Sequence, residues 1–279
     1  MAIEPEAIKF AHVQHAGDRP HATYWGSVSS DASDPASSLQ SAANEHGFGR
    51  VTCTTLLEPA DYQILMVEPP KVPADELKAA IRWKIKDLIE YHIDDATVDV
   101  FEVRGEGEAK GTAKAMYAVA TPNEVVQKRI ALFEEASVPL KVIDIPEMAQ
   151  RNIAGLFESP DKATAMLAFS SWGGLLTISI HGELLLTRRL EVTSTQLGQR
   201  EHGDHYRERG VGVGNLLLAP LPQDPELEQF LAGKLYVPVV GAALPEVMDF
   251  AGGTEPTAQE QWEYFHLFGA ALRVEGKAL

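Results

Sequence analysis

The stretch PADELKAAIRWKIKDLIEY, residues 73–91, carries the clearest structural signal in the chain. Its apolar side chains recur at three- and four-residue steps and form one stripe along a helix: Leu77, Ile81, Ile85, Leu88 and Ile89. Pro73 suits a first helical turn, and the two acidic residues that follow favour the positive end of the helix dipole. The stretch therefore predicts an amphipathic helix with one buried face.

Trp83 lies near the middle of the opposite face of this helix, beside Lys86 and Glu90. Aromatic residues that stay exposed are enriched where proteins bind one another. These three residues are therefore a candidate partner-binding surface. Burial of Trp83 under a neighbouring strand or lobe is the alternative that the sequence leaves open.

Strand patterns lie on both sides of the helix. We expect strands over residues 7–13, 22–28, 50–56, 63–67, 96–103, 113–120 and 138–145. A helix is expected over 121–136, where Thr121, Pro122 and Glu124 have the spacing of a capping box, and another begins at Pro146. A polar stretch at 158–162 then predicts a lobe boundary.

The second half of the chain changes character. Three consecutive strand patterns, at 164–169, 175–181 and 183–190, are joined by glycine-containing turns and predict an antiparallel meander. Residues 193–210 are polar and irregular; further strands at 215–221 and 235–240, a short helix at 225–231 and an aromatic-rich C-terminal helix at 259–273 follow. The sequence therefore predicts an α/β fold with two mixed sheets.

Composition restricts the function. The 279 residues contain 24 basic and 40 acidic side chains, a net charge of −16, which disfavours nucleic acid and anionic lipid as partners. The single cysteine, Cys53, cannot form an internal disulfide, and the acidic N-terminus does not resemble a signal peptide. No apolar run approaches the ~20 residues that span a bilayer. We expect a soluble, cytoplasmic protein.

The sequence contains few motifs that indicate catalysis or ligand binding. The turn Ser170–Gly174 between two strands could bring backbone N–H groups to a phosphate, although a plain hairpin explains it equally simply. Gly210–Gly214 precedes a strand rather than a helix, so it does not fit a dinucleotide fingerprint. Glu201–His205 could supply metal ligands, but no distant third ligand is evident and a solvated loop is the simpler interpretation. We expect no metal site.

Four segments resemble a known family. They are AIRWKIKDLI at 80–89, IDDATVDVF at 93–101, VIDIPE at 142–147 and LLTR at 185–188, and they resemble the MshI family of MSHA-type (type IV) pilus biogenesis. That family is similar to PilM of type IV pili and to the cytoplasmic part of GspL in type II secretion. The resemblance spans most of residues 4–275.

The resemblance implies an actin-like (ribonuclease H-like) α/β fold with two lobes around a nucleotide cleft. Lobe one would be residues 1–158, with a small subdomain inserted at about 71–145. Lobe two would be residues 159–279, with the C-terminal helix, about 259–273, packing back on lobe one.

The sequence departs from the nucleotide motifs of the actin-like group. The chain begins at what corresponds to the second strand, so the first Asp-x-Gly phosphate strand is expected to be missing. The second phosphate turn lacks its usual acidic residue. Residues that would still touch a nucleotide are Ser170, Ser171, Gly173, Gly174 and, as an echo of an adenosine motif, Gly252 and Gly253. Because phosphoryl transfer needs a metal and positioned donors together, we expect no efficient ATPase and no required cofactor.

The resemblance implies a non-catalytic adaptor of pilus biogenesis. It would bind the cytoplasmic tail of a bitopic, PilN-like inner-membrane protein and lie at the membrane only through that partner. The acidic surface suits a basic tail. One alternative is an actin-like switch that binds ATP and Mg²⁺ with weak or no hydrolysis. Another is a small-molecule enzyme, for which the sequence identifies no catalytic aspartate.

Overall fold

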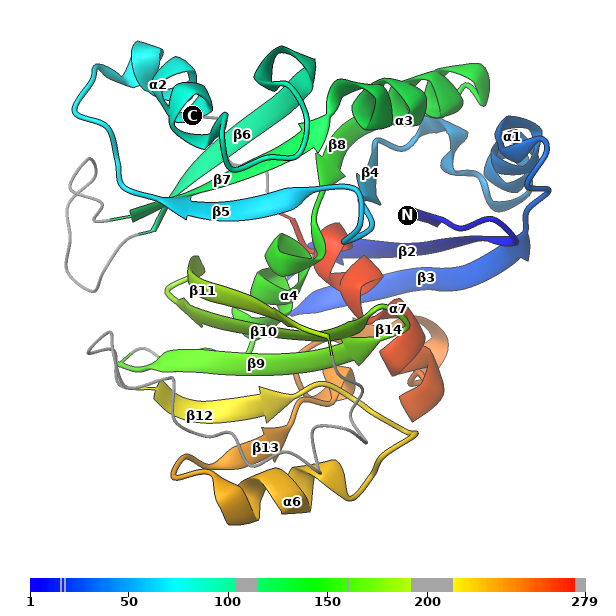
Figure 1. Cartoon of the computed structure of the whole chain (residues 1–279). Coiled ribbons are helices and arrows are strands. Elements are labelled where there is room, and N and C mark those ends of the chain that lie inside the picture. The colour runs from blue at the N-terminus through cyan, green and yellow to red at the C-terminus, as the bar shows by residue number, and fades with distance from the viewer. Residues whose placement is uncertain (16, 18, 104–114, 160, 192–212, 274–279) are drawn as a thin grey trace. The chain divides into compact units, whose positions relative to one another are not determined.

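The computed structural model describes the chain except residues 16, 18, 104–114, 160, 192–212 and 274–279 (Figure 1). The described residues form two compact units. The first comprises Met1–Ile8 and Ser27–Ile145, and the second comprises Lys9–Gly26 and Pro146–Arg273. None of the described helices is both long and apolar enough to cross a membrane.

The boundary differs from the expected division at residue 158. Helix α4 (Pro146–Ala154) packs on strands of the second unit and on its C-terminal helix α7 (Ala258–Ala271), so the second unit begins at Pro146. The tip of the first hairpin also belongs to that unit, because the Trp25 ring lies 5.4 Å from the Phe250 ring and 6.0 Å from the Phe268 ring. Helix α7 thus packs on residues that the sequence analysis assigned to lobe one.

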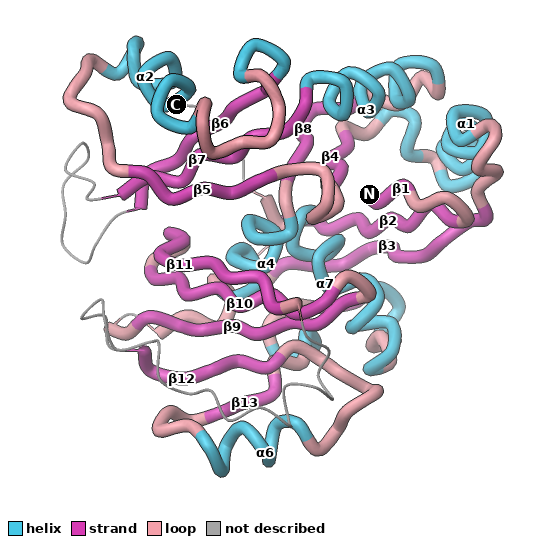
Figure 2. Tube along the Cα trace, in the orientation of Figure 1, coloured by secondary structure: helices cyan, strands magenta, loops and turns pink. Residues whose placement is uncertain are grey.

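In the first unit, helices alternate along the chain with groups of strands (Figure 2). Its elements, two of which extend into the second unit, are β1 (Ala2–Ile3), β2 (Ala7–His15), β3 (Pro20–Ser29), α1 (Pro35–His46), β4 (Cys53–Leu56), β5 (Gln63–Val67), α2 (Leu77–Ile85), β6 (Ala96–Val103), β7 (Ala115–Pro122), α3 (Asn123–Glu135) and β8 (Leu140–Asp144).

A strand that the sequence analysis did not expect precedes β2. Strand β1 pairs with β2, and Met1 bridges to β4: its amino group donates to the Thr54 carbonyl at 2.7 Å and its carbonyl accepts from the Leu56 N–H at 3.1 Å. The first strand is therefore present but truncated to two residues, and residues 2–6 contain no Asp-x-Gly motif. The strand is two residues long, too short for a periodicity signal.

Helix α2 covers the three-stranded antiparallel sheet β5-β7-β6. As the apolar stripe predicts, Ile81 and Ile85 are fully buried, and they pack with Val100, Met116 and Ala118 of the sheet. Each such isoleucine contributes roughly 1.5–3 kcal/mol through burial. The helix ends at Ile85, six residues before the predicted end, and turns follow. Ile89 is nevertheless buried in the same core.

Helix α3 begins without the predicted capping box. Thr121 donates its hydroxyl to the Asp61 carbonyl at 2.7 Å instead of capping the helix, and no side-chain bond caps the first turn. The hydroxyl is used to tie β7 to the loop before β5.

The second unit is built on a five-stranded sheet in the order β11-β10-β9-β12-β13. Strands β9 (Ala163–Ser170), β10 (Gly173–Ile180) and β11 (Glu183–Leu190) form the predicted antiparallel meander, and β12 (Val213–Leu218) and β13 (Val239–Gly241) extend it in parallel. Helix α6 (Leu227–Lys234) lies between them in the chain, and β14 (Asp249–Phe250) pairs with β3.

Helices α4 and α7 cross at very short range. A Cβ added to Gly269 would lie 2.2 Å from the Ala149 carbonyl oxygen, so only glycine fits at this crossing. Helix α7 begins with a capping box in which Thr257 and Glu260 bond each other's backbone N–H groups.

Candidate functional site

The hairpin between β9 and β10 holds the candidate phosphate residues. Ser170 pairs with Gly173 across a two-residue turn of Ser171 and Trp172. A Cβ on Gly173, whose φ is +124°, would lie 2.7 Å from the Leu190 carbonyl oxygen, and a Cβ on Gly174 would lie 2.9 Å from the Phe169 ring. Close packing against the end of β11 therefore accounts for both glycines without a ligand.

Trp172 of this turn packs on a buried polar network. Its ring lies 5.7 Å from the ring of His266, whose Nε2 lies 3.2 Å from Oε1 of Gln150. Nε2 of Gln150 in turn faces the Met166 and Leu175 carbonyls and the Thr177 hydroxyl, each within 3.0 Å. Burial lowers the pKa of His266 to about 4, so the ring is neutral at physiological pH and serves as a hydrogen-bond donor within the fold.

A buried carboxylate lies on α4 of the same unit. Glu147 is fully buried, and its Oε1 accepts a hydrogen bond from Nε of Arg189 at 3.1 Å and lies 3.0 Å from a terminal guanidinium nitrogen of the same arginine. This ion pair ties α4 to β11. A carboxylate held in this way does not match the mobile, metal-facing acid that phosphoryl transfer requires.

Gly252 and Gly253 lie in a turn after β14, and both have a φ of +69°. This left-handed conformation by itself favours glycine. At the β1–β2 turn, the residues are Glu4, Pro5 and Glu6. Proline has no N–H to offer a phosphate, and two carboxylates would repel one.

Metal ligands are not gathered in the part of the chain that the structure describes: it contains no group of three His, Cys, Asp or Glu side chains that could hold an ion. The candidate segment Glu201–His205 lies outside the described residues, as does most of Gly210–Gly214.

The candidate partner surface on α2 is open to solvent. Trp83 is 68% exposed, and the ammonium of Lys86 lies 5.1 Å from the centre of its ring. Glu90 is also exposed. Of the two alternatives that the sequence left open, exposure rather than burial of Trp83 is the one observed among the described residues.

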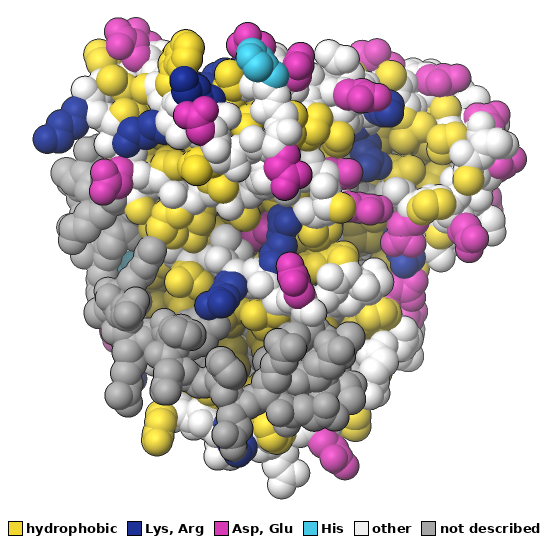
Figure 3. Space-filling model, viewed as in Figure 1, with side chains coloured by type: hydrophobic (Ala, Val, Ile, Leu, Met, Phe, Trp, Pro, Cys, Tyr) yellow, Lys and Arg dark blue, Asp and Glu magenta, His cyan; other side chains and the backbone are white. Residues whose placement is uncertain are grey.

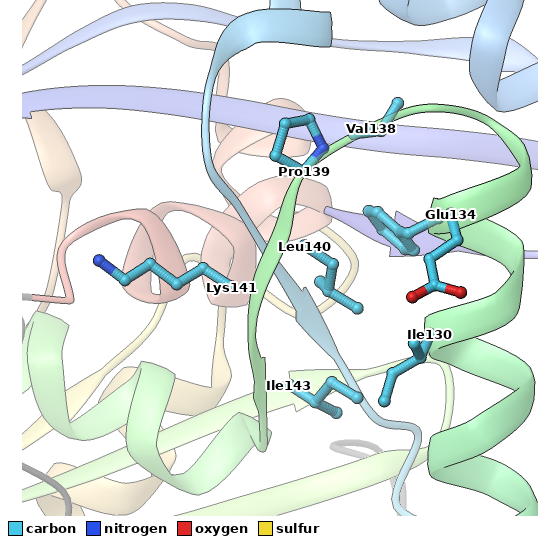
Figure 4. A pocket seen from close by; sticks show the side chains of 8 residues that line it. Ile130, Glu134, Val138, Pro139, Leu140, Lys141 and Ile143 are labelled. Atoms are coloured by element: carbon cyan, nitrogen blue, oxygen red, sulfur yellow. The ribbon is translucent and has the colours of Figure 1, made fainter.

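A groove that the sequence analysis missed lies between α3 and β8 of the first unit (Figure 4). Its volume is about 420 Å³, and its lining residues are mostly apolar: Ile130, Phe133, Glu134, Val138, Pro139, Leu140, Lys141 and Ile143. Figure 4 shows Ile130, Leu140 and Ile143 in the space between the two elements, whereas Lys141 extends away from α3.

A bulge in β8 shapes this groove. Cys53 pairs with Leu140, and Thr54 pairs with Val142. Lys141 is therefore an extra residue in β8 that has no β4 residue opposite it. Leu140 and Ile143 consequently share a face. No β4 residue lines the groove, and β8 pairs with no strand other than β4 among the described residues.

No protein-family model and no curated protein matches the sequence. Solved structures do share its fold. The structure titled "PilM-PilN type IV pilus biogenesis complex" aligns with a TM-score of 0.73 at 18% identity, covering 97% of this chain and 95% of the matched chain. The cytoplasmic domain of EpsL, an inner-membrane component of the Vibrio cholerae type II secretion system, aligns with a TM-score of 0.53 at 12% identity, over 94% and 90% of the two chains.

A Bacteroides thetaiotaomicron protein, described as having an actin-like ATPase fold and unknown function, aligns with a TM-score of 0.49 at 9% identity, over 93% of this chain and 92% of that one. The alignments with the PilM and EpsL structures show the fold of those proteins, a mixed α/β fold as the family resemblance implies. At these identities, the likeness is one of fold.

Proposed function

We propose that this chain is a non-catalytic adaptor of a type IV pilus, and that its α3–β8 groove binds the cytoplasmic tail of an inner-membrane protein. The groove is the observation that carries the proposal, because it offers an apolar channel between α3 and β8. The matched pilus structure is titled as a complex of PilM with PilN, which supports a PilN-like partner. The MshI-like segments favour a pilus of the MSHA type.

An extended peptide suits this geometry. In a segment lying along β8, alternate side chains would enter the apolar space between Ile130, Leu140 and Ile143, and its backbone would be placed to pair with the strand. Such strand addition gives affinity through the main chain and specificity through the pocket. A short tail next to a membrane segment can bind in this way without a folded domain of its own.

The acidic side of the groove, on α3, favours a basic tail; the other charged lining residue, Lys141, extends away from α3 (Figure 4). Cytoplasmic segments that flank membrane spans carry an excess of lysine and arginine. Glu134 lines the groove on the exposed end of α3, within a chain of net charge −16. Opposite charge accelerates the encounter and orients the partner. The adaptor would thus lie on the cytoplasmic side of the inner membrane, held there by its partner.

The second unit supports a non-catalytic role. The glycines of its β9–β10 hairpin are required by close packing. Glu147, the buried carboxylate on α4, is paired with Arg189. The turn itself offers Ser171 and Trp172 rather than an acid that could position a metal-bound water.

Co-purification tests the proposal. The tail of the PilN-like protein encoded with this chain, fused to an inert carrier, should retain wild-type protein on a column. Ile130→Asp places a charge in the groove at a position that is already 41% exposed, so the fold should survive while binding is lost. Ala131→Asp, on an exposed neighbouring position outside the groove, is the matched control and should bind normally. Equal retention of the Ile130 variant, or no retention of wild type, would refute the groove assignment.

A further inference from the structure

The α2 face carries an exposed tryptophan for which the fold gives no reason. The core of the three-stranded sheet is filled by Ile81 and Ile85, both fully buried, while Trp83 between them points away and is 68% exposed. Exposing so large an apolar side chain to water is unfavourable unless a binding partner covers it. Tryptophan is among the residues most enriched at interaction hot spots.

The same segment is basic in an acidic chain. Residues 77–86 contain four cations and no carboxylate, whereas the whole chain has a net charge of −16. In Figure 3, basic side chains lie beside apolar ones on the side of the first unit that carries α2, at the upper left. The cations are Lys78, Arg82, Lys84 and Lys86.

Most of this positive charge is not neutralised by an acid. Arg82 donates to the backbone carbonyls of Ala96 and Ile93, and Lys84 donates to the Glu68 carbonyl at 3.0 Å. A carbonyl fixes the position of a cation but leaves its net charge in place. Lys78 differs, because it pairs with the Asp99 carboxylate at 2.9 Å. The positive charge around Trp83 is therefore held in position and available to a partner.

Lys86 and Trp83 form a single recognition element. The ammonium lies 5.1 Å from the ring centre, within the range of a cation–π contact, so each side chain restricts the other. Ala79, one turn before Trp83, is small and exposed and leaves room beside the ring. A partner would contact the apolar face of the Trp83 ring, which has positioned ammonium groups beside it.

We propose that this surface, made of Ala79, Trp83, Lys84 and Lys86, docks an acidic segment of a second protein partner, one that presents carboxylates around an apolar side chain. The surface is independent of the α3–β8 groove, whose charge suits a basic tail. A second copy meeting it through the same face would bring lysine against lysine.

The width of the basic surface favours a segment over a membrane. The nine residues of α2 span about 14 Å. Acids lie at both ends of the basic stretch: Asp75 and Glu76 before it, Asp87 and Glu90 after it. Because charges are screened within about 8 Å at physiological salt, a narrow acidic peptide would interact mainly with the lysines. A planar anionic bilayer would also face the flanking carboxylates.

Fluorescence anisotropy with two labelled peptides tests the proposal: one built from glutamate, leucine and glycine, and one with lysine in place of each glutamate. The acidic peptide should bind wild type, and the lysine peptide should not compete for the surface. Trp83→Ala and the double variant Lys84→Glu, Lys86→Glu should each weaken binding about tenfold or more, and binding should weaken as salt rises.

Two controls locate the effect. Lys128→Glu changes an exposed lysine on α3 and should leave the acidic peptide bound as in wild type. Glu134→Lys, which alters the groove, should also leave it bound, so this surface and the tail groove are tested separately. The proposal would be overturned if the acidic peptide failed to bind or if Trp83→Ala bound it equally well. It would also be overturned if the protein co-sedimented with phosphatidylglycerol vesicles in place of binding the peptide. Concentration-dependent self-association that is lost in Trp83→Ala would overturn it as well.

Discussion

Nε2 of His266 lies 3.2 Å from Oε1 of Gln150, and this contact fixes which ring nitrogen carries the proton. The amide nitrogen of Gln150 faces three acceptors, so its Oε1 must be the acceptor toward His266. Nε2 of His266 is therefore the donor in a neutral ring. Protonation of the second ring nitrogen would leave this bond in place but would bury a positive charge in the link between α4, α7 and the sheet of the second unit.

Stability should consequently fall in acid. Burial lowers the pKa of His266 from its ordinary 6.5 to about 4, so the unfolded chain binds a proton at a higher pH than the folded one. The contribution is complete above pH 6.5, decreases as the pH falls toward 4, and amounts to about 3 kcal/mol in all. The free energy of urea unfolding, measured at pH 7 and at pH 4.5, should show the decrease in wild type and a smaller one in His266→Gln. An identical decrease in both proteins would contradict the assignment.

Gly269→Ala should destabilise the second unit strongly. The new methyl carbon would lie 2.2 Å from the Ala149 carbonyl oxygen, so the backbones of α4 and α7 must separate. We expect a loss of about 2–3 kcal/mol or more in the free energy of unfolding. Gly233→Ala is the matched control: Gly233 lies in α6 with nothing within 4 Å of its Cβ position, and alanine there should stabilise by about 0.5–1 kcal/mol. Similar effects of the two substitutions would show that the helix crossing is looser than the structure indicates.

MgATP should not stabilise the protein. A ligand present at a hundredfold excess over its Kd adds about 2.7 kcal/mol to stability, which a thermal-shift measurement detects easily. The packed hairpin glycines and the Glu4–Glu6 turn lead us to expect no saturable rise in Tm with millimolar MgATP. A saturable rise would favour the alternative of a nucleotide-dependent switch.

The sequence predicts what depends on local periodicity. Ile81, Ile85 and Ile89 of the apolar stripe are buried as expected, whereas Leu88, beyond the end of α2, is 56% exposed. Residues 96–103 form a strand with the predicted limits. Local propensity predicts the structure less well where a tertiary contact competes for the same side chain. Thr121 has the spacing of a helix cap, but its hydroxyl bonds the distant Asp61 carbonyl.

The groove could not be predicted from the sequence because two non-local facts create it. Strand β8 pairs with β4, which lies more than eighty residues earlier in the chain, and the bulge at Lys141 exists only relative to that partner. The only local sign is Ile130, an apolar residue on α3 that is 41% exposed. The hairpin glycines mislead in the same way, since Leu190 of another strand explains them.

The most direct test of the adaptor proposal is calorimetric titration of the partner's tail peptide into three proteins. Wild type and Glu135→Lys should bind with similar affinity, because Glu135 lies on the exposed end of α3 but outside the groove lining. Glu134→Lys reverses a charge within the lining and should weaken binding about tenfold or more, chiefly at low salt. Equal affinities for Glu134→Lys and Glu135→Lys, or no heat of binding with wild type, would contradict the account.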